Sequence, residues 1–351
     1  MAIAVLCGRF SPKILLCFVL TAALSIGVYE YLGHRDRIVP VMSNDLDLRK
    51  YMPYSADVPR LHEDSTLRIG KDFPVLDGAL ALYPLYSAYV TALYPKGDYP
   101  IGFRNDVRTH RRYHYYDASP ERHGEKAIPH PVHFTNTIEG FKGLLNGRVD
   151  IFFMADISAE QKEMAAKKDV KLKFTPIGKE AFVFFVNVKN PVDNLSLEQI
   201  RGIYSGKIMR WDDLGGRGKI KAFQRNKNSG SQSALERIMG EIPLAEAPTM
   251  ELRGSMGGII LDVADYKNYE NAIGFSFRYF TNVMVQNNQI KLLKIDGVAP
   301  TLENIRNGSY PLIAPYYAIT RGDAKNPNIP KMLEWFVSER GRYLADKVMG
   351  G

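Results

Sequence analysis

A loop of small residues beside an arginine is the part of this sequence best suited to bind an anion. The run Asn228-Ser229-Gly230-Ser231 opens readily into a turn, and the apolar residues after it recur with the spacing of one helical face. The first amide N–H groups of a helix lack intrahelical partners, so together with serine hydroxyls and the helix dipole they attract anions. Arg225 adds a planar fork of donors that suits a tetrahedral oxyanion.

Two registers and two roles are open for this helix. Ser229 is one candidate for its N-cap, and Ser233 is the other, with Glu236 completing a capping box. The same residues also suit an ordinary capped helix with a solvated arginine, which needs no ligand. The residues by themselves therefore predict a helix with small residues at its start, and an anion site there is one of two interpretations.

The loop resembles the phosphate loop of a known family, the phosphate-binding proteins of phosphate ABC transporters, within the periplasmic-binding-protein superfamily. The family's pattern R-x-x-x-S-G-[ST] maps onto Arg225, Ser229, Gly230 and Ser231. Four further segments are similar to that family and occur in the family's order: DGALALYP (Asp77 to Pro84), EGFKGLLNGRVDI (Glu139 to Ile151), Glu180 to Gly216 and NAIGFSFRYF (Asn271 to Phe280). The resemblance runs from about Asp72 to the C-terminus, with one interruption.

The resemblance implies an α/β protein with the two-lobe periplasmic-binding-protein fold of type II, in which one lobe interrupts the other. Lobe one is expected to comprise residues 72–175 and 275–351, with an insertion at 96–131, and lobe two residues 176–274. Strands that alternate with helices along the chain independently favour the α/β class.

Local patterns predict several of these elements. A short strand is expected at Phe73 to Leu76, and a buried strand at Ala181 to Val188 after the crossing into lobe two at Thr175-Pro176. Ser196 with Gln199 is expected to form a capping box for the helix that follows.

The resemblance also implies three site residues in the first lobe. Where Leu80 stands, the family usually has a threonine or serine whose hydroxyl binds phosphate, so here the next amide, on Ala81, is the expected donor. Thr137 stands at the position of the family's serine-rich anion loop, although it also suits a plain N-cap. Asp156 follows the apolar run Val149 to Met154, a predicted buried strand, near the place where a family aspartate accepts the proton of protonated phosphate.

Composition limits the other classes of function. At 351 residues the chain is long enough for two lobes with cores of their own, and its net charge of +8 is spread along the sequence without a basic block that predicts nucleic-acid binding. Cys7 and Cys17 are the two cysteines, so the sequence after Cys17 holds neither a disulfide framework nor a cysteine-based metal site. No metal or other cofactor is expected.

Five of the seven histidines fall between His110 and His133, inside or beside the predicted insertion. His110 and His114 have the spacing of two metal ligands on one helical face. Glycine and proline nearby make a regular helix doubtful, so a solvated insertion is the preferred interpretation.

The N-terminal segment predicts membrane attachment. The uncharged, mostly apolar run Ile14 to Leu32 has the length of about twenty residues that a spanning helix needs. We expect residues 1–33 to be an uncleaved signal anchor; the alternative is a signal peptide with a weak cleavage site at Ala23-Leu24-Ser25. Residues 34–71 are polar and lack a sustained period, so we expect a spacer before the globular part outside the cytoplasm.

Three functional hypotheses follow. The first is an extracytoplasmic solute-binding protein that captures an oxyanion, foremost phosphate, for an ABC transporter with a separate permease. The second is an enzyme with Ser229 or Ser231 as nucleophile; it is disfavoured because no G-x-S-x-G elbow is present and every histidine lies at or before His133. The third is a membrane-anchored sensor or adhesion module that keeps the fold and has lost or changed the phosphate ligand.

Overall fold

A computed structural model describes residues 48–97, 101–106, 111–116, 131–133, 135, 137–225, 227–247, 252–253 and 270–350. The predicted membrane segment Ile14 to Leu32 lies outside these residues. Within the described ranges, no helix combines the length and the apolar character that crossing a membrane requires.

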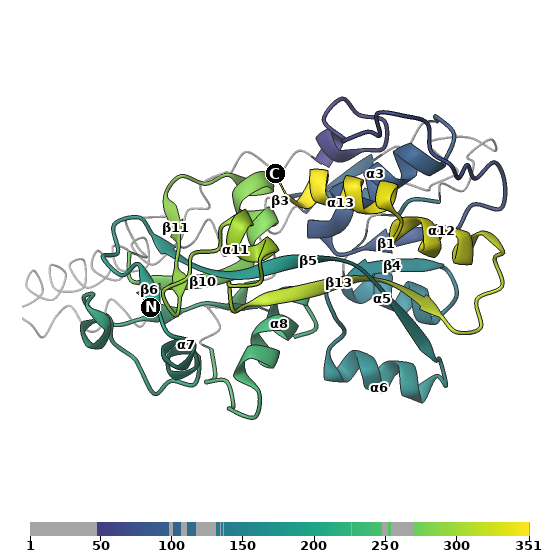
Figure 1. Ribbon diagram of the computed structural model, residues 1–351. Coiled ribbons are helices and arrows are strands. Elements are labelled where there is room, and N and C mark those ends of the chain that lie inside the picture. The colour runs from purple at the N-terminus through teal and green to yellow at the C-terminus, as the bar shows by residue number, and fades with distance from the viewer. Residues whose placement is uncertain are drawn as a thin grey trace, which may run out of the picture. The chain divides into compact units, whose positions relative to one another are not determined.

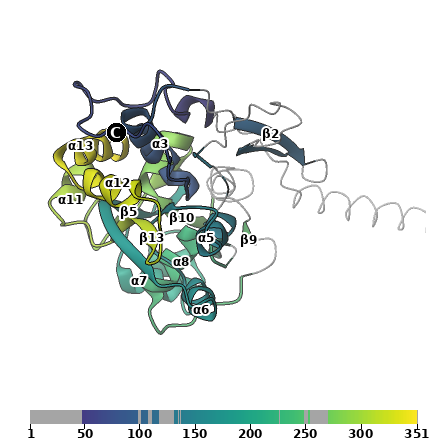
Figure 2. The same cartoon turned by 90° about the vertical axis from the view of Figure 1, so that its right-hand side faces the viewer.

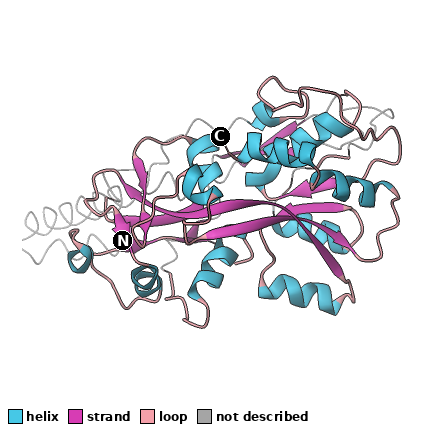
Figure 3. Cartoon of the chain, in the orientation of Figure 1, coloured by secondary structure: helices cyan, strands magenta, loops and turns pink. Residues whose placement is uncertain are grey.

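A mixed seven-stranded sheet is the centre of the fold, and strands and helices together confirm the predicted α/β class (Figure 3). Its strand order is β1-β4-β13-β5-β10-β7, and β11 pairs with β5 beside this path. The strands are β1 (Leu76–Gly78), β4 (Ile151–Met154), β5 (Leu172–Asn187), β7 (Lys221–Ala222), β10 (Ala272–Phe277), β11 (Ile290–Leu292) and β13 (Ile313–Arg321). β1 runs parallel to β4 and β7 parallel to β10, while β13 is antiparallel to both β4 and β5.

Three short strand pairs complete the β-structure of the described residues. They are β2 (Ile101–Asp106) with β3 (Arg111–Tyr116), β6 (Asn194–Leu195) with β12 (Lys294–Ile295), and β8 (Gln224–Arg225) with β9 (Leu252–Arg253). The β2–β3 hairpin lies in the predicted insertion, and His114 belongs to its second strand. His114 therefore lies in a strand, so the spacing of two metal ligands on one helical face does not hold here. His110 lies outside the described residues.

Helices cover the crossing strands β5 and β13 from two sides. The helices are α3 (Tyr83–Leu93), α5 (Thr137–Leu145), α6 (Ala159–Lys167), α7 (Leu197–Tyr204), α8 (Gly230–Met239), α11 (Leu302–Arg306), α12 (Asn328–Phe336) and α13 (Glu339–Met349). Helices α3, α12 and α13 lie on one side of the β5–β13 pair and α6 and α8 on the other (Figures 1 and 2). The predicted capping box of Ser196 and Gln199 starts α7, as expected.

Strand β5 begins nine residues before the predicted strand Ala181 to Val188, and it runs without a break through Thr175-Pro176, where the sequence suggested a crossing between lobes. Its first half mixes polar, small and apolar residues and is mostly exposed or half-buried, so the sequence shows no apolar run there. The pairing with β13 shifts by one residue at Tyr316 and Tyr317, which marks a bulge.

Two hydrophobic clusters lie along the sheet. One packs α5 and α6 on β4, with Phe141, Phe152 and Ile157 among its buried members. The other packs α7 and α8 on the second half of β5 and on β10, where the ring centroids of Phe182 and Phe275 lie 5.5 Å apart. β5 and β13 take part in the strand pairing beside both clusters, so these two strands connect them.

Part of the predicted spacer is folded. Leu48, Val58 and Ile69 are buried, and the Ile69 amide donates to the Leu93 carbonyl at the end of α3 over 2.8 Å. The sequence missed this segment because three isolated apolar residues produce no periodic pattern. The first strand is also displaced, from the predicted Phe73 to Leu76 to the observed Leu76–Gly78.

Candidate functional site

The structure settles the register of α8. Ser229 is the N-cap, with extended backbone angles (φ −72°, ψ 142°), and its hydroxyl oxygen accepts a hydrogen bond from the Gln232 amide over 3.3 Å. Ser233 lies inside the helix and is buried, so the alternative capping box with Glu236 does not start this helix. Gly230 and Ser231 are thus the first two helical residues, where amide N–H groups point away from the helix.

Gly230 leaves open space at the first turn of α8. A Cβ atom placed on Gly230 meets no described atom within 4 Å. This open space adjoins the Cα of Gly230, at the start of a helix whose first amides suit an anion.

Arg225, at the end of β8, places its guanidinium beside this turn. Nη1 of Arg225 donates to the Ser231 hydroxyl over 3.1 Å, and the Arg225 side chain is 8% exposed. Burial lowers the pKa of Arg225 to about 10, which leaves the guanidinium charged at neutral pH. A charged group at this depth is stabilised by a nearby anion, because water does not fully solvate it.

Two glutamines brace this arrangement, and no motif in the sequence indicates them. The Gln232 side-chain oxygen accepts from the Arg225 amide over 2.9 Å. Its Nε2 donates to Gln224 over 3.3 Å, and Gln224 in turn donates to the Ala245 carbonyl over 2.9 Å. This chain of bonds fixes β8 against the first turn of α8, so the position of Arg225 is defined by the backbone as well as by its own side chain.

Asn228 ties the loop to a distant part of the chain. Its backbone is left-handed (φ 65°), a conformation that asparagine tolerates better than most residues. The Ser158 hydroxyl donates to Asn228 Oδ1 over 2.6 Å, and Asn228 Nδ2 donates to Glu160 over 2.7 Å. Both partners belong to the start of α6, so the loop before α8 contacts the segment that follows β4.

The other predicted site residues follow strands β1 and β4. Ala81 is buried in the 3₁₀ helix Leu80–Leu82 just after β1, and Leu80 is half-buried beside it. Thr137 is the first residue of α5. Because β1 and β4 are parallel neighbours, their carboxyl ends bring Ala81 and Asp156 to the same edge of the sheet.

A buried carboxylate organises this edge. Asp77 of β1 is 1% exposed and accepts from the Thr135 hydroxyl over 2.7 Å, from the Thr135 amide over 3.2 Å and from the Gly78 amide over 2.8 Å. Burial raises the pKa of Asp77 to about 6, and these three hydrogen bonds oppose the rise. Asp77 therefore holds Thr135 in place before α5, a role that no local pattern in the sequence indicates.

Asp156 lies against α8. Its Oδ1 accepts from the Ile157 amide over 2.8 Å, and its Oδ2 forms an ion pair with Arg237 Nη1 at 3.0 Å. The two side chains are 32% and 39% exposed, so solvent screens the pair. Arg237 was not among the predicted site residues, because its position two turns beyond Ser229 on α8 matches no motif.

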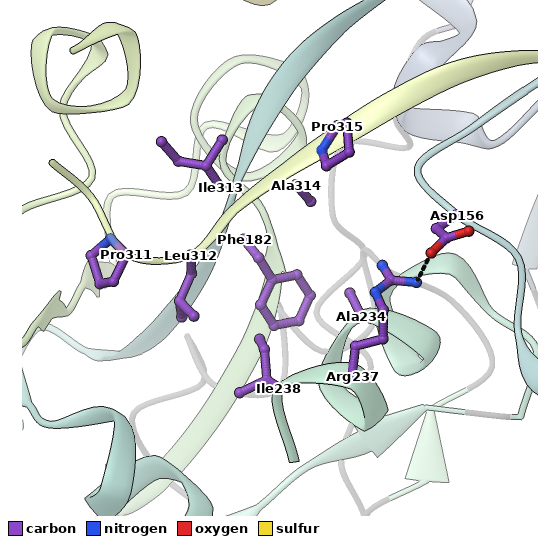
Figure 4. Close-up of a pocket in the computed structure, with 10 residues that line it drawn as sticks. All are labelled: Asp156, Phe182, Ala234, Arg237, Ile238, Pro311, Leu312, Ile313, Ala314 and Pro315. Carbon is purple, nitrogen blue, oxygen red and sulfur yellow. Dashed lines mark hydrogen bonds and ion pairs between the residues drawn. The ribbon is translucent and has the colours of Figure 1, made fainter. Parts of the chain in front are cut away.

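A pocket of about 250 Å³ begins at this ion pair (Figure 4). Its walls come from α8, from the start of β13 and from β5, and eight of the ten lining residues are apolar; the ten are Asp156, Phe182, Ala234, Arg237, Ile238, Pro311, Leu312, Ile313, Ala314 and Pro315. Asp156 is the one predicted site residue in the pocket wall, and Arg225 and the Ser229–Ser231 loop lie outside it.

The structure thus groups the predicted residues into two sets. Arg225, Ser229, Gly230 and Ser231 surround the first turn of α8. Ala81, Thr137 and Asp156 follow the edge of β1 and β4, and Asp156 also contacts α8. In the part of the chain that the structure describes, no group of three or more histidine, cysteine, aspartate or glutamate residues is arranged to hold a metal ion.

Comparisons with known proteins show which family and which fold the chain resembles. A family model for a PBP superfamily domain matches residues 119–340. The phosphate-binding protein PstS of Bacillus subtilis (strain 168) is 31% identical over 175 residues, which cover 48% of this chain and 53% of that protein. PstS of Staphylococcus haemolyticus is 26% identical over 215 residues, covering 59% of this chain and 67% of the relative. The matched region thus spans only about half of the length of the Bacillus relative.

Two solved structures share the fold. A protein from Clostridium perfringens, assigned as a phosphate ABC transporter substrate-binding protein and solved with bound phosphate, has a TM-score of 0.55 at 22% identity and covers 79% of this chain and 97% of its own. An ABC-type phosphate transport receptor from Vibrio cholerae has a TM-score of 0.53 at 19% identity, with coverages of 78% and 98%. At these identities the likeness establishes the fold.

Proposed function

The chain belongs to the family of PBP superfamily domains, and on that premise we propose that it is an extracytoplasmic solute-binding protein that captures a tetrahedral oxyanion, foremost phosphate, for an ABC transporter. Its curated relatives carry the name of phosphate-binding proteins. The anion would be held by hydrogen-bond donors in a closing cleft, without a covalent step, so no enzymatic activity is proposed.

One observation carries this proposal. A buried, charged guanidinium lies beside the first turn of α8, where Arg225 contacts Ser231 and the backbone at Gly230 faces open space. A helix start with free amides and an adjacent arginine provides the directional donors and the positive charge that a tetrahedral oxyanion requires. Ser229 and Ser231 supply hydroxyls at the same turn.

We further propose that the ligand lies between two lobes, residues 72–175 with 275–351 and residues 176–274. Two hydrophobic clusters, joined by β5 and β13, support the presence of two lobes. Leu293, Ile295 and Leu312 pack in the cluster of α7 and α8, so part of residues 275–351 packs with lobe two. The contacts of Arg237 with Asp156 and of Asn228 with Ser158 then cross from one lobe to the other. On the first lobe, the Ala81 amide, the Thr137 hydroxyl and Asp156 complete the proposed anion site.

The proposed setting is the outer face of a membrane. Ile14 to Leu32 would anchor the chain, or be cleaved as a signal peptide, and a separately encoded permease would receive the anion. Protease added to intact cells should digest the chain after Arg37, and full protection until lysis would contradict this topology.

Calorimetric titration with phosphate, arsenate and sulfate tests the binding function. Wild type should bind at least one of these anions, and Arg225→Ala should weaken that binding by roughly ten- to a hundredfold, the loss of one charge-assisted donor. Arg210→Ala is the matched control, because Arg210 is an exposed arginine paired with Asp212 at 2.9 Å. Thermal melting of each variant separates lost binding from lost folding. If wild type binds none of the anions up to millimolar concentration, the sensor or adhesion module becomes the better hypothesis.

A further inference from the structure

The apolar pocket beside α8 shares a helical stripe with the proposed anion site. Gly230, Ala234 and Ile238 follow one another at intervals of four residues, and such residues lie on one face of a helix. Gly230 is in the first turn, and Ala234 and Ile238 line the pocket. With a rise of about 1.5 Å per residue, Ala234 lies roughly 6 Å along the helix from Gly230. A ligand held at the first turn therefore needs only a short extension to reach the pocket.

The pocket walls suit an uncharged group. Figure 4 shows Phe182, Ala234 and Ile238 facing the same space, with the proline-rich start of β13 across from them. The two charged lining residues, Asp156 and Arg237, lie at one end and pair with each other at 3.0 Å. Their charges thus largely neutralise each other within the protein. A hydrocarbon group against the remaining wall is removed from water and gains dispersion attraction.

The volume limits the size of that group. About 250 Å³ is below the roughly 300–1,000 Å³ of pockets that enclose a complete drug-sized ligand. It suits a short alkyl chain or a single ring. Leu80, half-buried after β1, adds an apolar side chain to the opposite set of site residues, at a place where it cannot donate a hydrogen bond to an oxygen.

We propose that the ligand is a phosphoryl compound with a small apolar substituent, such as an alkyl- or arylphosphonate or the corresponding phosphate monoester. This inference rests on the proposed oxyanion-binding function and names its substrate class. The phosphoryl oxygens bind Arg225 and the first turn of α8, and the substituent enters the pocket between Ala234, Ile238 and Phe182. Asp156 and Arg237 pair with each other at one end of the pocket, so the wall favours an uncharged substituent.

Calorimetry on the full chain tests this proposal with inorganic phosphate and with methyl-, propyl- and phenylphosphonate. Methyl- and propylphosphonate share the head group, so the ratio of their dissociation constants measures the contribution of the substituent. Burial of a methylene tightens binding about fourfold, and propylphosphonate, with two more methylenes, should therefore have a dissociation constant roughly fifteenfold below that of methylphosphonate. Propyl phosphate, the monoester, distinguishes a preference for the ester from one for the phosphonate.

Variants of the pocket wall localise the effect. In Ala234→Leu the larger side chain occupies the pocket. The ratio of the methylphosphonate to the propylphosphonate dissociation constant should therefore fall to about one. Ala166→Leu, on the exposed face of α6, makes the same change away from the pocket and should keep the wild-type ratio. Ile238→Gln, at a partly buried position, provides a second test if Ala234→Leu melts at the working temperature.

The outcomes separate this proposal from the function on which it rests. If phosphate binds and propylphosphonate binds no tighter than methylphosphonate, the pocket is only a packing space and the substituent proposal is wrong, while the oxyanion function stands. If neither phosphate nor any phosphoryl compound binds, both are wrong. A propyl preference that persists in both Ala234→Leu and Ile238→Gln would place the substituent elsewhere and overturn the assignment to this pocket.

Discussion

The start of α8 and the edge of β1 and β4 bury charges of opposite sign. Arg225 at the start of α8 is a buried cation, and burial lowers its pKa to about 10. Asp77 at the edge of β1 is a buried carboxyl, and burial raises its pKa to about 6. The buried charge of Arg225 stabilises an oxyanion at the start of α8. At the edge of β1 and β4, an ionised Asp77 repels it.

The hydrogen bonds of the two regions also favour an anion at the start of α8 over one at the edge of β1 and β4. At the start of α8, the backbone at Gly230 remains open to a ligand. At the edge of β1 and β4, Asp77 accepts hydrogen bonds from the Thr135 hydroxyl and amide, and Asp156 forms an ion pair with Arg237. The side chain of Leu80 cannot donate a hydrogen bond. The α8 side therefore supplies most of the proposed anion affinity, and the β1–β4 side contributes shape and the closing contacts. Four predictions test this contrast, from the largest expected effect to the smallest.

The largest effect concerns the pH dependence of stability at the β1–β4 edge. The folded chain holds a proton on Asp77 up to a pKa of about 6, whereas the ordinary pKa of aspartate is 3.8, so the native state binds more protons between these values. The free energy of unfolding should therefore fall as pH rises from about 4 to 6, by at most about 1.4 kcal/mol per pH unit. In Asp77→Asn this part of the slope should vanish, as measured by denaturant unfolding at several pH values.

Glu180 provides the internal comparison for that experiment. It is buried in β5, and burial raises its pKa to about 8, while Arg278 and two backbone amides oppose the rise. Its contribution should continue to lower stability from about pH 4.5 to 8, and Asp77→Asn should retain that slope. If stability between pH 4 and 6 has the same slope in wild type and Asp77→Asn, the buried carboxyl at β1 does not titrate as described.

The second effect removes one amide donor from the α8 side. Gly230→Pro deletes the N–H at the first helical position, where proline is favoured, and the extended backbone of Ser229 is compatible with a following proline. We expect phosphate to bind about tenfold or more weakly, the loss of one hydrogen bond to a charged ligand. Gly230→Ala retains the amide and should lose clearly less. Equal losses in the two variants would show that the space at Gly230 matters and the amide does not.

The third effect breaks the contact between the two regions. Asn228→Gly keeps the left-handed backbone and removes the side chain that bonds Ser158 and Glu160. Two lost hydrogen bonds, one of them exposed, should cost about 1–2 kcal/mol of closure and raise the dissociation constant by roughly three- to thirtyfold. A double-mutant cycle with Glu160→Ala measures the coupling. Strictly additive losses would mean that this pair does not hold the two segments together.

The sequence predicted the α8 region far better than the β1–β4 edge. The cap, the turn and Arg225 lie within seven consecutive residues, so their relation was visible as a local motif. The register of α8 stayed open because Ser229 and Ser233 both satisfy capping rules, and the choice depends on the brace from Gln232 to β8.

Long-range partners explain most of what the sequence did not reveal. Asp156 and Arg237 are eighty-one residues apart, and Asp77 and Thr135 are fifty-eight residues apart. Such pairs depend on how strands are ordered in the sheet, which local periodicity does not specify. The long strand β5 was likewise predicted only over its apolar second half, because its first half is paired with β13 and yet mostly exposed or half-buried.

The smallest effect restores a hydroxyl to the β1–β4 side. Leu80→Thr places a donor one residue before the Ala81 amide, and a single new hydrogen bond should tighten inorganic phosphate by roughly two- to tenfold. The same change should lower the ratio of the methylphosphonate to the propylphosphonate dissociation constant, because it makes the edge of β1 and β4 more polar. Weaker phosphate binding in Leu80→Thr would indicate that the side chain is needed for packing, or that the ligand has no oxygen at this position.

A crystal structure of the chain grown with arsenate, phased at the arsenic edge, tests the central claim most directly. The account predicts an anomalous peak within hydrogen-bond distance of the Arg225 guanidinium and of the amides at Gly230 and Ser231, with Asp156 on the opposite side. A peak bound only elsewhere in the molecule, with Arg225 still turned to Ser231 and the first turn of α8 facing solvent, would contradict it.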